Sequence, residues 1–311
     1  MVIAAKVPQP ALVWDGRTNK NAKWPRPLAP GATIGLFAPA SHFSPEDLER
    51  GAEILRSWGL RVKIPKGLVG DKGFLNLAGD DEHRAAILSE LMQDDSVDGL
   101  MAVRGGYGCQ RLLPILAPLW AQWPAKPIFG FSDLTALHLA RFQASGVIGF
   151  HSPTVAWLDK KTDDLSRDDL RGTLTSGNRS GHWTFSPGKV LKAGRARGPL
   201  LGGNLTLLTA LLTSPWLPNM KNAILLLEDV GEKPYQLDRL MISLRQSPVW
   251  KAASGLVFGS FTKCGPKAVV ARIIKEAADD FNGPVIHQAP FGHSRRNRIF
   301  PLGATAELNT F

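Results

Sequence analysis

The sequence predicts an α/β protein with an N-terminal, doubly wound parallel-sheet domain and a smaller C-terminal α/β domain. Short apolar runs alternate with helical patterns between residues 33 and 150, and again after residue 200, which is typical of parallel strands covered by helices. A polar segment with few large apolar residues separates the two stretches. The length of 311 residues fits about two domains of ordinary size.

Residues 1–29, which are rich in Pro, Lys and Asn, are expected to form an extension wrapped on the body. The first domain is expected to span residues 30–156. Its first helix should begin after Ser44, because this Ser can cap a helix that has Pro45 at its first position, and should end at Gly59. The expected strands cover residues 33–38, 61–64, 99–103, 127–129 and 147–150, and the expected helices cover residues 44–58, 83–92, 108–116 and 133–144.

Residues 157–192 hold several Asp, Arg, Ser and Gly residues and are expected to be a linker or exposed excursion. The second domain is expected to span residues 193–311. Its expected helices cover residues 204–212, 235–245 and 269–281, and its expected strands cover residues 223–227, 255–258 and 284–286.

Composition excludes several classes of protein. Hydrophobic residues make up 44% and charged residues 21%, so the chain is not disordered. No apolar run approaches the roughly 20 residues of a membrane helix. The two cysteines, Cys109 and Cys264, are too few for a disulfide scaffold. The first residues show no signal peptide, and a cytoplasmic location is therefore expected.

The net charge is +10, but the basic residues are dispersed. Neither a basic helix nor a ladder of aromatic and basic residues is present, so a nucleic-acid partner is not expected. A basic surface, or attraction for a small anionic substrate, explains the charge better.

Polar residues follow four of the expected strands. In open α/β sheets, ligands bind beyond the carboxyl ends of the strands. A Gly-rich loop follows the third strand, and a turn with Ser132 follows the fourth. In the second domain Glu228 follows one strand, and His293 lies soon after another.

Ser132 lies on a strand-to-helix turn, which is the setting of a nucleophile elbow. The N–H of Asp133 at the helix start could help to hold an oxyanion. An equally ordinary role for Ser132 is to cap the helix. The frame Gly130-Phe131-Ser132-Asp133-Leu134 lacks the second Gly of the α/β-hydrolase elbow.

The glycines at 105 and 106 permit close approach of the backbone, and one of their N–H groups could be a second oxyanion donor. A plain tight turn is the alternative, and the spacing does not fit a dinucleotide site. Glu228 is either a solvated strand end or a carboxylate that orients a histidine, with Asp229 and Glu232 as competitors. His293 is in a loop rich in Gly, Arg and Asn.

The other histidines are weaker candidates. His138 is expected to pack within a helix, and His151 and His287 end strands. No pair of histidines has the spacing of a metal motif, and the site loops lack cysteine, so no zinc site is expected. Ser132, His293 and Glu228 together offer a nucleophile, a base and an orienting carboxylate.

At these residues the sequence resembles the LD-carboxypeptidase family of serine peptidases, which also includes microcin-immunity peptidases. The matching segments run in the family's order from residue 30 onward: Pro30–Ala40 (PGATIGLFAPA), Arg104–Gly108 (RGGYG), Gly130–Thr135 (GFSDLT), Leu201–Leu205 (LGGNL), Leu227–Glu232 (LEDVGE), Pro234-Tyr235, Asp238-Arg239, Gly292-His293 and Pro301–Gly303 (PLG).

The resemblance implies a triad of Ser132, His293 and Glu228 and oxyanion donors at the N–H groups of Gly106 and Asp133. It also implies an active site between the two domains, a homodimer, and neither a metal nor an organic cofactor. The implied substrate is a cytoplasmic peptidoglycan tetrapeptide of murein recycling, which is cut before its terminal D-Ala.

A carboxypeptidase must recognise the carboxylate of its substrate, and Arg can bind a carboxylate in bidentate fashion. The candidates are Arg104 in the Gly-rich loop, and Arg295, Arg296 or Arg298 after His293. Tyr107 of the same Gly-rich loop is a further candidate for substrate binding. Arg104 could equally hold the loop in place.

Two other functions stay open. One is a microcin-immunity-type peptidase or amidase that acts on a nucleotide-peptide, for which Trp157 and Trp183 flank the segment to inspect. The other is a non-catalytic α/β protein that binds a small ligand, in which Ser132 would be only a cap.

Overall fold

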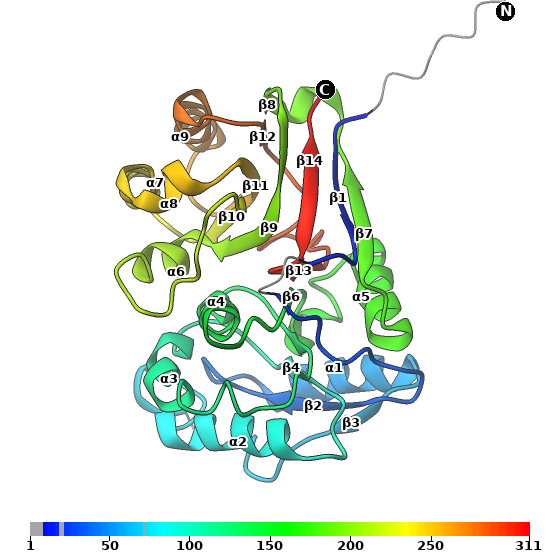
Figure 1. Cartoon of the computed structure of the whole chain (residues 1–311). Coiled ribbons are helices and arrows are strands. Elements are labelled where there is room, and N and C mark those ends of the chain that lie inside the picture. Colours follow the sequence, from blue (N-terminus) through cyan, green and yellow to red (C-terminus); the bar gives the residue numbers. More distant parts are fainter. Residues whose placement is uncertain (1–8, 19–21, 71) are drawn as a thin grey trace, which may run out of the picture.

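Two β-sheets with their helices lie one above the other in the computed structural model of the chain, which describes residues 9–18, 22–70 and 72–311 (Figure 1). The first sheet has the strand order β13-β6-β5-β4-β2-β3, in which only β13 is antiparallel to its neighbour. Its strands are β2 (Thr33–Phe37), β3 (Arg61–Lys63), β4 (Gly99–Ala102), β5 (Ile128–Phe129), β6 (Gly149–His151) and β13 (Phe300–Leu302).

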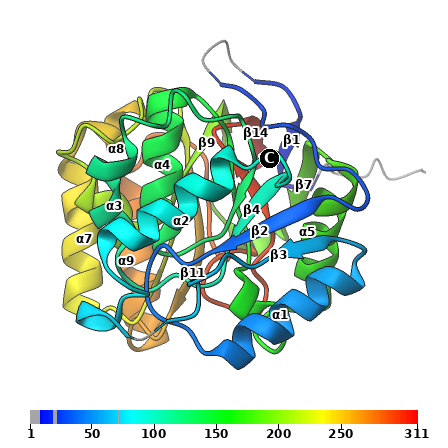
Figure 2. The same cartoon turned by 90° about the horizontal axis from the view of Figure 1, so that it is seen from below.

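Helices cover both faces of this sheet, as a doubly wound domain requires (Figure 2). One face carries α1 (Pro45–Ser57), and the other carries α2 (Asp81–Gln93), α3 (Cys109–Leu116) and α4 (Leu134–Ser145). The predicted cap of α1 is present, since the Ser44 hydroxyl accepts from the N–H of Asp47 at 3.1 Å. In the same way Asp80 caps α2 through His83, so this helix begins two residues before the predicted start.

The strand order places a topological switch point between β2 and β4, because the chain continues to one side of β2 with β3 and to the other with β4. The loops after these strands meet there. The N–H of Ser41 donates to the carbonyl of Gly105 at 3.3 Å, and the Ser41 hydroxyl accepts from the N–H of Tyr107 at 3.1 Å. A crevice for ligands is expected at this edge of the sheet.

The second sheet has the strand order β7-β1-β14-β9-β10-β11-β12-β8 and is parallel from β9 to β12. Its strands are β1 (Ala11–Asp15), β7 (Ser180–Thr184), β8 (Val190–Lys192), β9 (Arg195–Asn204), β10 (Ile224–Val230), β11 (Gly255–Thr262), β12 (Val285–Ile286) and β14 (Thr305–Asn309). Its helices are α6 (Leu205–Ala210), α7 (Pro234–Gln246), α8 (Pro248–Ala252) and α9 (Lys267–Asp280), which lie together on one side of the sheet (Figure 1).

The predicted linker over residues 157–192 is wrong, because these residues form α5 (Asp164–Ser176), β7 and β8. Asp163 caps α5 by accepting from the N–H of Ser166 at 2.9 Å. Leu170 and Leu174 lie four residues apart in this helix, so both reach the main core from one face of the helix. In β7 the fully buried Trp183 packs edge-to-face on Trp14, with the ring centroids 5.7 Å apart.

The predicted N-terminal extension supplies β1, which lies between β7 and β14; residues 1–8 and 19–21 fall outside the described residues. A second buried cluster, rich in Trp and Phe, lies beneath β1, β7 and β14. Three short 3₁₀ turns, at Phe74–Asn76, Val155–Trp157 and Pro187–Lys189, complete the elements. Within the described residues, none of the helices has the length and apolar character needed to cross a membrane.

Candidate active site

Ser132 lies on a tight turn between β5 and α4. Its φ of +66° is in the left-handed region, which costs a non-Gly residue about 1 kcal/mol or more. The turn is so tight that a β-carbon on Gly130 would lie 2.5 Å from the side chain of Leu134. The helix cap is Asp133 rather than Ser132, and the Ser132 hydroxyl points to a different partner. The cap interpretation of Ser132 is therefore wrong.

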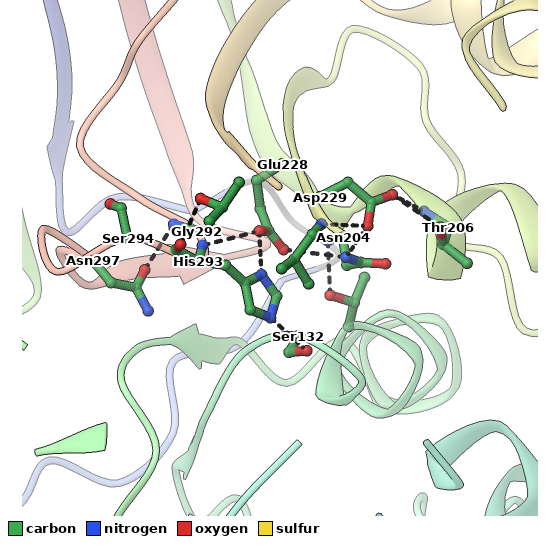
Figure 3. A network of polar contacts seen from close by, with 12 residues as sticks. Ser132, Asn204, Thr206, Glu228, Asp229, Gly292, His293, Ser294 and Asn297 are labelled. Carbon is green, nitrogen blue, oxygen red and sulfur yellow. Dashed lines mark hydrogen bonds and ion pairs between the residues drawn. The ribbon is translucent and has the colours of Figure 1, made fainter. Parts of the chain in front are cut away.

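That partner is His293, and Glu228 lies behind it (Figure 3). The His293 Nε2 is 2.9 Å from the Ser132 Oγ, and the Nδ1 is 2.6 Å from the Glu228 Oε2. Glu228 is fully buried, so it is not a solvated strand end. Because an ionised carboxylate only accepts hydrogen bonds, Nδ1 carries the proton and Nε2 is free to accept from the hydroxyl.

The loop that carries His293 is fixed from both sides. Asn297 is fully buried, and its Oδ1 accepts from the N–H of Gly292 at 2.9 Å and from His151 Nε2 at 3.0 Å. Burial lowers the pKa of His151 to about 3, so this imidazole is neutral and donates through Nε2. From β11 the Thr262 hydroxyl donates to the carbonyl of His293 at 2.6 Å. These contacts aim the imidazole at Ser132 before any substrate binds.

A polar network beside Glu228 links the two sheets. The Asn204 side-chain NH₂ donates to Asp229 at 2.9 Å and lies 3.4 Å from the Glu228 Oε1, while the N–H of Asn204 donates to Thr135 of α4 at 3.0 Å. Asp229 also accepts from the N–H and hydroxyl of Thr206. Burial and the charge of Glu228 raise the pKa of Asp229 to about 6.

The two competitors predicted for Glu228 have other partners. Asp229 binds the network just described, and Glu232 accepts from the hydroxyl of Thr206 at 3.3 Å. Glu228 is thus the carboxylate that contacts the imidazole.

The Gly-rich loop after β4 lies against Ser132. A β-carbon on Gly105 would be 2.9 Å from the Ser132 Cβ, and Gly106 has a φ of +113° that favours glycine. Within the part of the chain that the structure describes, the N–H groups of Gly106 and Asp133 donate to no protein acceptor. Two donors thus remain available for a ligand near the hydroxyl.

Two buried side chains hold this loop. The Asp133 carboxylate accepts from the N–H of Cys109 at 2.7 Å, which ties the elbow to the start of α3. The fully buried guanidinium of Arg84 donates to the carbonyl of Gly108 at 3.2 Å and to the carbonyl of Pro39 at the end of β2. The loops at the switch point therefore cannot shift without breaking buried hydrogen bonds.

The predicted carboxylate-binding residues separate into two groups. Arg296 and Arg298 pair with carboxylates of the α5 region, at 2.7 Å to Asp163 and 2.5 Å to Asp169. These ion pairs make Arg296 and Arg298 poorer candidates for binding the terminal carboxylate than Arg104 and Arg295. Among the described residues, no acidic side chain forms an ion pair with Arg104 or Arg295.

Arg104 donates to the carbonyl of His42 at 2.9 Å, so it also holds the loop as the alternative predicted. Arg295 is exposed, and Tyr107 is 47% exposed. His138 packs inside α4 as predicted, and its Nε2 lies 3.0 Å from the carbonyl of Gly130. Over residues 9–18, 22–70 and 72–311, no group of His, Cys, Asp and Glu side chains is arranged to hold a metal ion.

Sequence reasoning missed three residues that shape the site: Ser41, Asn204 and Asn297. Asn204 had a usable signal, because an Asn after Gly202-Gly203 and before an apolar run is a typical helix cap, and it does cap α6. The sequence holds no comparable local signal for Asn297, whose partners His151 and Gly292 come together only in the folded chain.

This arrangement supports nucleophilic catalysis. A base at hydrogen-bond distance can take the hydroxyl proton, a buried carboxylate holds the base in one orientation, and unused N–H groups stand ready for an oxyanion.

Comparisons with known proteins identify the family of the chain. Residues 34–152 match the family model of the LD-carboxypeptidase N-terminal domain, and residues 197–308 match that of its C-terminal domain. A putative carboxypeptidase of Synechocystis is 35% identical over 302 residues, covering 93% of this chain and 95% of that protein. The murein tetrapeptide carboxypeptidase of Pseudomonas aeruginosa is 32% identical over 288 residues, covering 88% and 92%.

The microcin C7 self-immunity protein MccF of Escherichia coli is 28% identical over 319 residues, covering 91% of this chain and 92% of that protein. Among solved structures, an MccF-like protein of Bacillus anthracis has a TM-score of 0.79 at 22% identity and covers 93% of this chain and all of that one. The muramoyltetrapeptide carboxypeptidase of Oxalobacter formigenes has a TM-score of 0.75 at 25% identity and covers 89% and 99%.

Proposed function

The chain belongs to the LD-carboxypeptidase family of peptidases, and we propose that it releases terminal D-Ala from peptidoglycan tetrapeptides by serine chemistry. The observation that carries the proposal is the continuous series of contacts from Ser132 through His293 to the buried Glu228. The resemblance to murein tetrapeptide carboxypeptidases supplies the substrate class.

In the proposed reaction the Ser132 oxygen attacks the carbonyl between the diamino acid and D-Ala, while its proton passes to His293 Nε2. Glu228 stabilises the imidazolium that forms. The C–N bond then breaks, the same proton goes to the departing amine of D-Ala, and an ester to Ser132 remains. A water molecule, deprotonated by His293, hydrolyses this ester and restores the free serine.

The N–H groups of Gly106 and Asp133 would receive the oxyanion that forms on the carbonyl oxygen. Both are backbone donors in segments held by hydrogen bonds, of Tyr107 to Ser41 and of Cys109 to Asp133, so they need not reorganise as the charge develops. Loss of one such donor in a serine hydrolase costs about 10²–10³-fold in kcat.

The proposal includes a cytoplasmic site of action in murein recycling and a homodimer, both of which the family resemblance implies. Cell fractionation tests the location. Light scattering of the purified protein tests the dimer, because a twofold mass difference is unambiguous by this method.

A microcin-immunity-type activity is a second candidate, favoured by the similarity to MccF and by Trp157. The Trp157 ring lies 5.7 Å from that of His293, where an aromatic base of a nucleotide could stack. Trp183, the other tryptophan predicted for this role, is 1% exposed inside the second sheet and cannot serve.

The deciding experiment supplies the purified protein with the tetrapeptide L-Ala-γ-D-Glu-meso-diaminopimelyl-D-Ala and measures released D-Ala. An aminoacyl sulfamoyl nucleoside is offered in parallel, and Ser132→Ala serves as the inactive control. Release of D-Ala that disappears in the control supports the proposal. Cleavage of the nucleoside compound alone would favour the second candidate, and cleavage of neither would favour a binding protein.

A further inference from the structure

A cavity of about 510 Å³ lies at the carboxyl ends of β11 and β12, beside the start of α9. We call it the basic cavity, because Lys189, Lys267 and Arg296 line it and no acidic residue is among its described lining residues. Its volume is in the range of ordinary small-molecule sites, which span about 300–1,000 Å³. None of the roles assigned above uses it.

The positive charge of the basic cavity is incompletely neutralised. Lys189 donates to the carbonyl of Gln288 at 2.8 Å, and burial together with the charge of Arg296 lowers the pKa of its ammonium group. Arg296 has one carboxylate partner, Asp163, whereas Lys267 stands exposed at the first turn of α9, where the N-terminal helix dipole adds to the positive potential. An anion in the cavity would relieve this mutual repulsion.

Part of the lining is apolar. Val270, Ala271 and Ile274 contribute to it from the same face of α9 as Lys267, together with Phe261 of β11. A ligand that suits this lining combines an oxyanion with an uncharged organic body. A free inorganic ion would leave the apolar part of the lining in contact with water.

The basic cavity adjoins the catalytic loop, since it is lined by Ser294 and Arg296, which lie one and three residues after His293. Ser260 also lines it, and its buried hydroxyl, which has no hydrogen-bond partner among the described residues, lies against Gly292. A ligand in the cavity would therefore contact the same loop that presents the imidazole to Ser132.

We propose that the basic cavity is a second subsite of the enzyme, which binds an oxyanion of the substrate remote from the bond that is cut. This inference rests on the proposed function. In a stem peptide the γ-linked D-Glu leaves its α-carboxylate free, and a nucleotide-linked precursor adds phosphates, so either group could supply the oxyanion. Terminal D-Ala is held separately, close to Ser132.

The test compares Lys267→Glu, which reverses one charge of the cavity, with Lys251→Glu, an equal change at an exposed residue of α8 outside it. Three substrates are used: the tetrapeptide, the tetrapeptide with its D-Glu α-carboxylate amidated, and the UDP-N-acetylmuramoyl-linked tetrapeptide. For Lys267→Glu we expect KM to rise about tenfold with little change in kcat, because the lost contact is remote from the reacting atoms. Unchanged melting temperatures show that both variants fold.

If the D-Glu carboxylate is the ligand, amidation raises the KM of the wild type and removes the effect of Lys267→Glu. If phosphate is the ligand, Lys267→Glu raises the KM of the UDP-linked substrate and of neither other substrate. Equal KM values for Lys267→Glu and Lys251→Glu on all three substrates would overturn the proposal.

A binding measurement separates failure of the subsite from failure of the proposed function. Calorimetry of the tetrapeptide and the UDP-linked tetrapeptide with Ser132→Ala, and with the Ser132→Ala/Lys267→Glu double variant, needs no turnover. If the wild type releases no D-Ala but binding depends on Lys267, the proposed function is refuted and the subsite is supported. If binding does not depend on Lys267, only the proposal of a second subsite is refuted.

Discussion

The backbone of Gly292 lies directly on Glu228: a β-carbon at residue 292 would be 2.7 Å from the Glu228 Cβ and 2.8 Å from its Oε2. Gly292 also has a φ of +100°, a conformation that other residues rarely adopt. The carboxylate can reach the neighbouring imidazole only because this position has no side chain.

Gly292→Ala should therefore damage activity far more than stability alone explains. The added methyl group pushes the His293 loop from Glu228, and a displacement of about 1 Å in such a site can cost on the order of 10²-fold in kcat. Gly59→Ala is the matched control, because Gly59 also has a positive φ, of +82°, but has open space around it. Equal kcat losses in both variants would show that backbone strain alone is responsible. Peptidase assays with thermal melting measure both effects.

Ser132 should be essential for catalysis but not for the stability of the fold. Ser132→Ala removes the nucleophile and keeps the strained φ, whereas Ser132→Gly removes the nucleophile and relieves the strain. We expect both variants to be inactive and the Gly variant to be more stable than the Ala variant by about 1 kcal/mol. Urea unfolding compares the two, and near-wild-type turnover in either would refute the role of the hydroxyl.

Glu228→Gln should lower kcat by about 10²–10⁴-fold, because an amide cannot stabilise the imidazolium and can hold the ring in the wrong tautomer. Glu232→Gln is the control, since Glu232 contacts Thr206 and not the imidazole. We expect its kcat to stay near that of the wild type. A larger loss at Glu232 than at Glu228 would reverse the assignment of the carboxylate.

Arg104 and Arg295 are the arginines left to recognise the carboxylate of D-Ala. Substitution of the responsible residue by Ala should lower kcat/KM for the tetrapeptide acid, and should matter much less for the C-terminal amide, which lacks the partner charge. Arg298→Ala should instead lower the melting temperature, because it leaves Asp169 without its ion pair. Equal losses for acid and amide in both Arg104→Ala and Arg295→Ala would assign those arginines to structure.

Stability should fall in mild acid because of buried neutral histidines. Burial lowers the pKa of His138 to about 4, well below its ordinary value of 6.5. Between these values the unfolded chain binds a proton that the folded chain does not, so stability present above pH 6.5 is lost as the pH falls toward 4. At pH 5 this amounts to about 1–2 kcal/mol for His138.

His138→Gln should keep a donor for the carbonyl of Gly130 and remove the titration. Urea unfolding at pH 7 and pH 5 should show a smaller loss for this variant than for the wild type. The opposite contribution of Asp229, whose raised pKa favours the folded state as the pH falls from about 6 to about 4, is common to both proteins and cancels. An equal acid loss in the variant would contradict the assignment.

The predictable parts of this chain are those with local signals. The cap at Ser44 and the apolar runs of β4 and β10 can be recognised within a few residues, and strand ends then identify Ser132 and Glu228 as candidates. The strands β1, β13 and β14 could not be found in this way, because they pair with segments far away in sequence, as Ala11 does with Asn309. Asp229 could be named from the sequence only as a competitor of Glu228, because its burial and its hydrogen bonds to Asn204 and Thr206 arise only in the folded chain.

One short segment contributes a strand to each of the two sheets. Residues 300–302 form the antiparallel edge of the first sheet, and residues 305–309 fill the second sheet between β1 and β9 (Figure 1). During synthesis the turn with Ser132 is made long before this segment. We therefore expect the contact between Ser132 and His293 to form late, only after the strands that follow His293 have been made and can join both sheets.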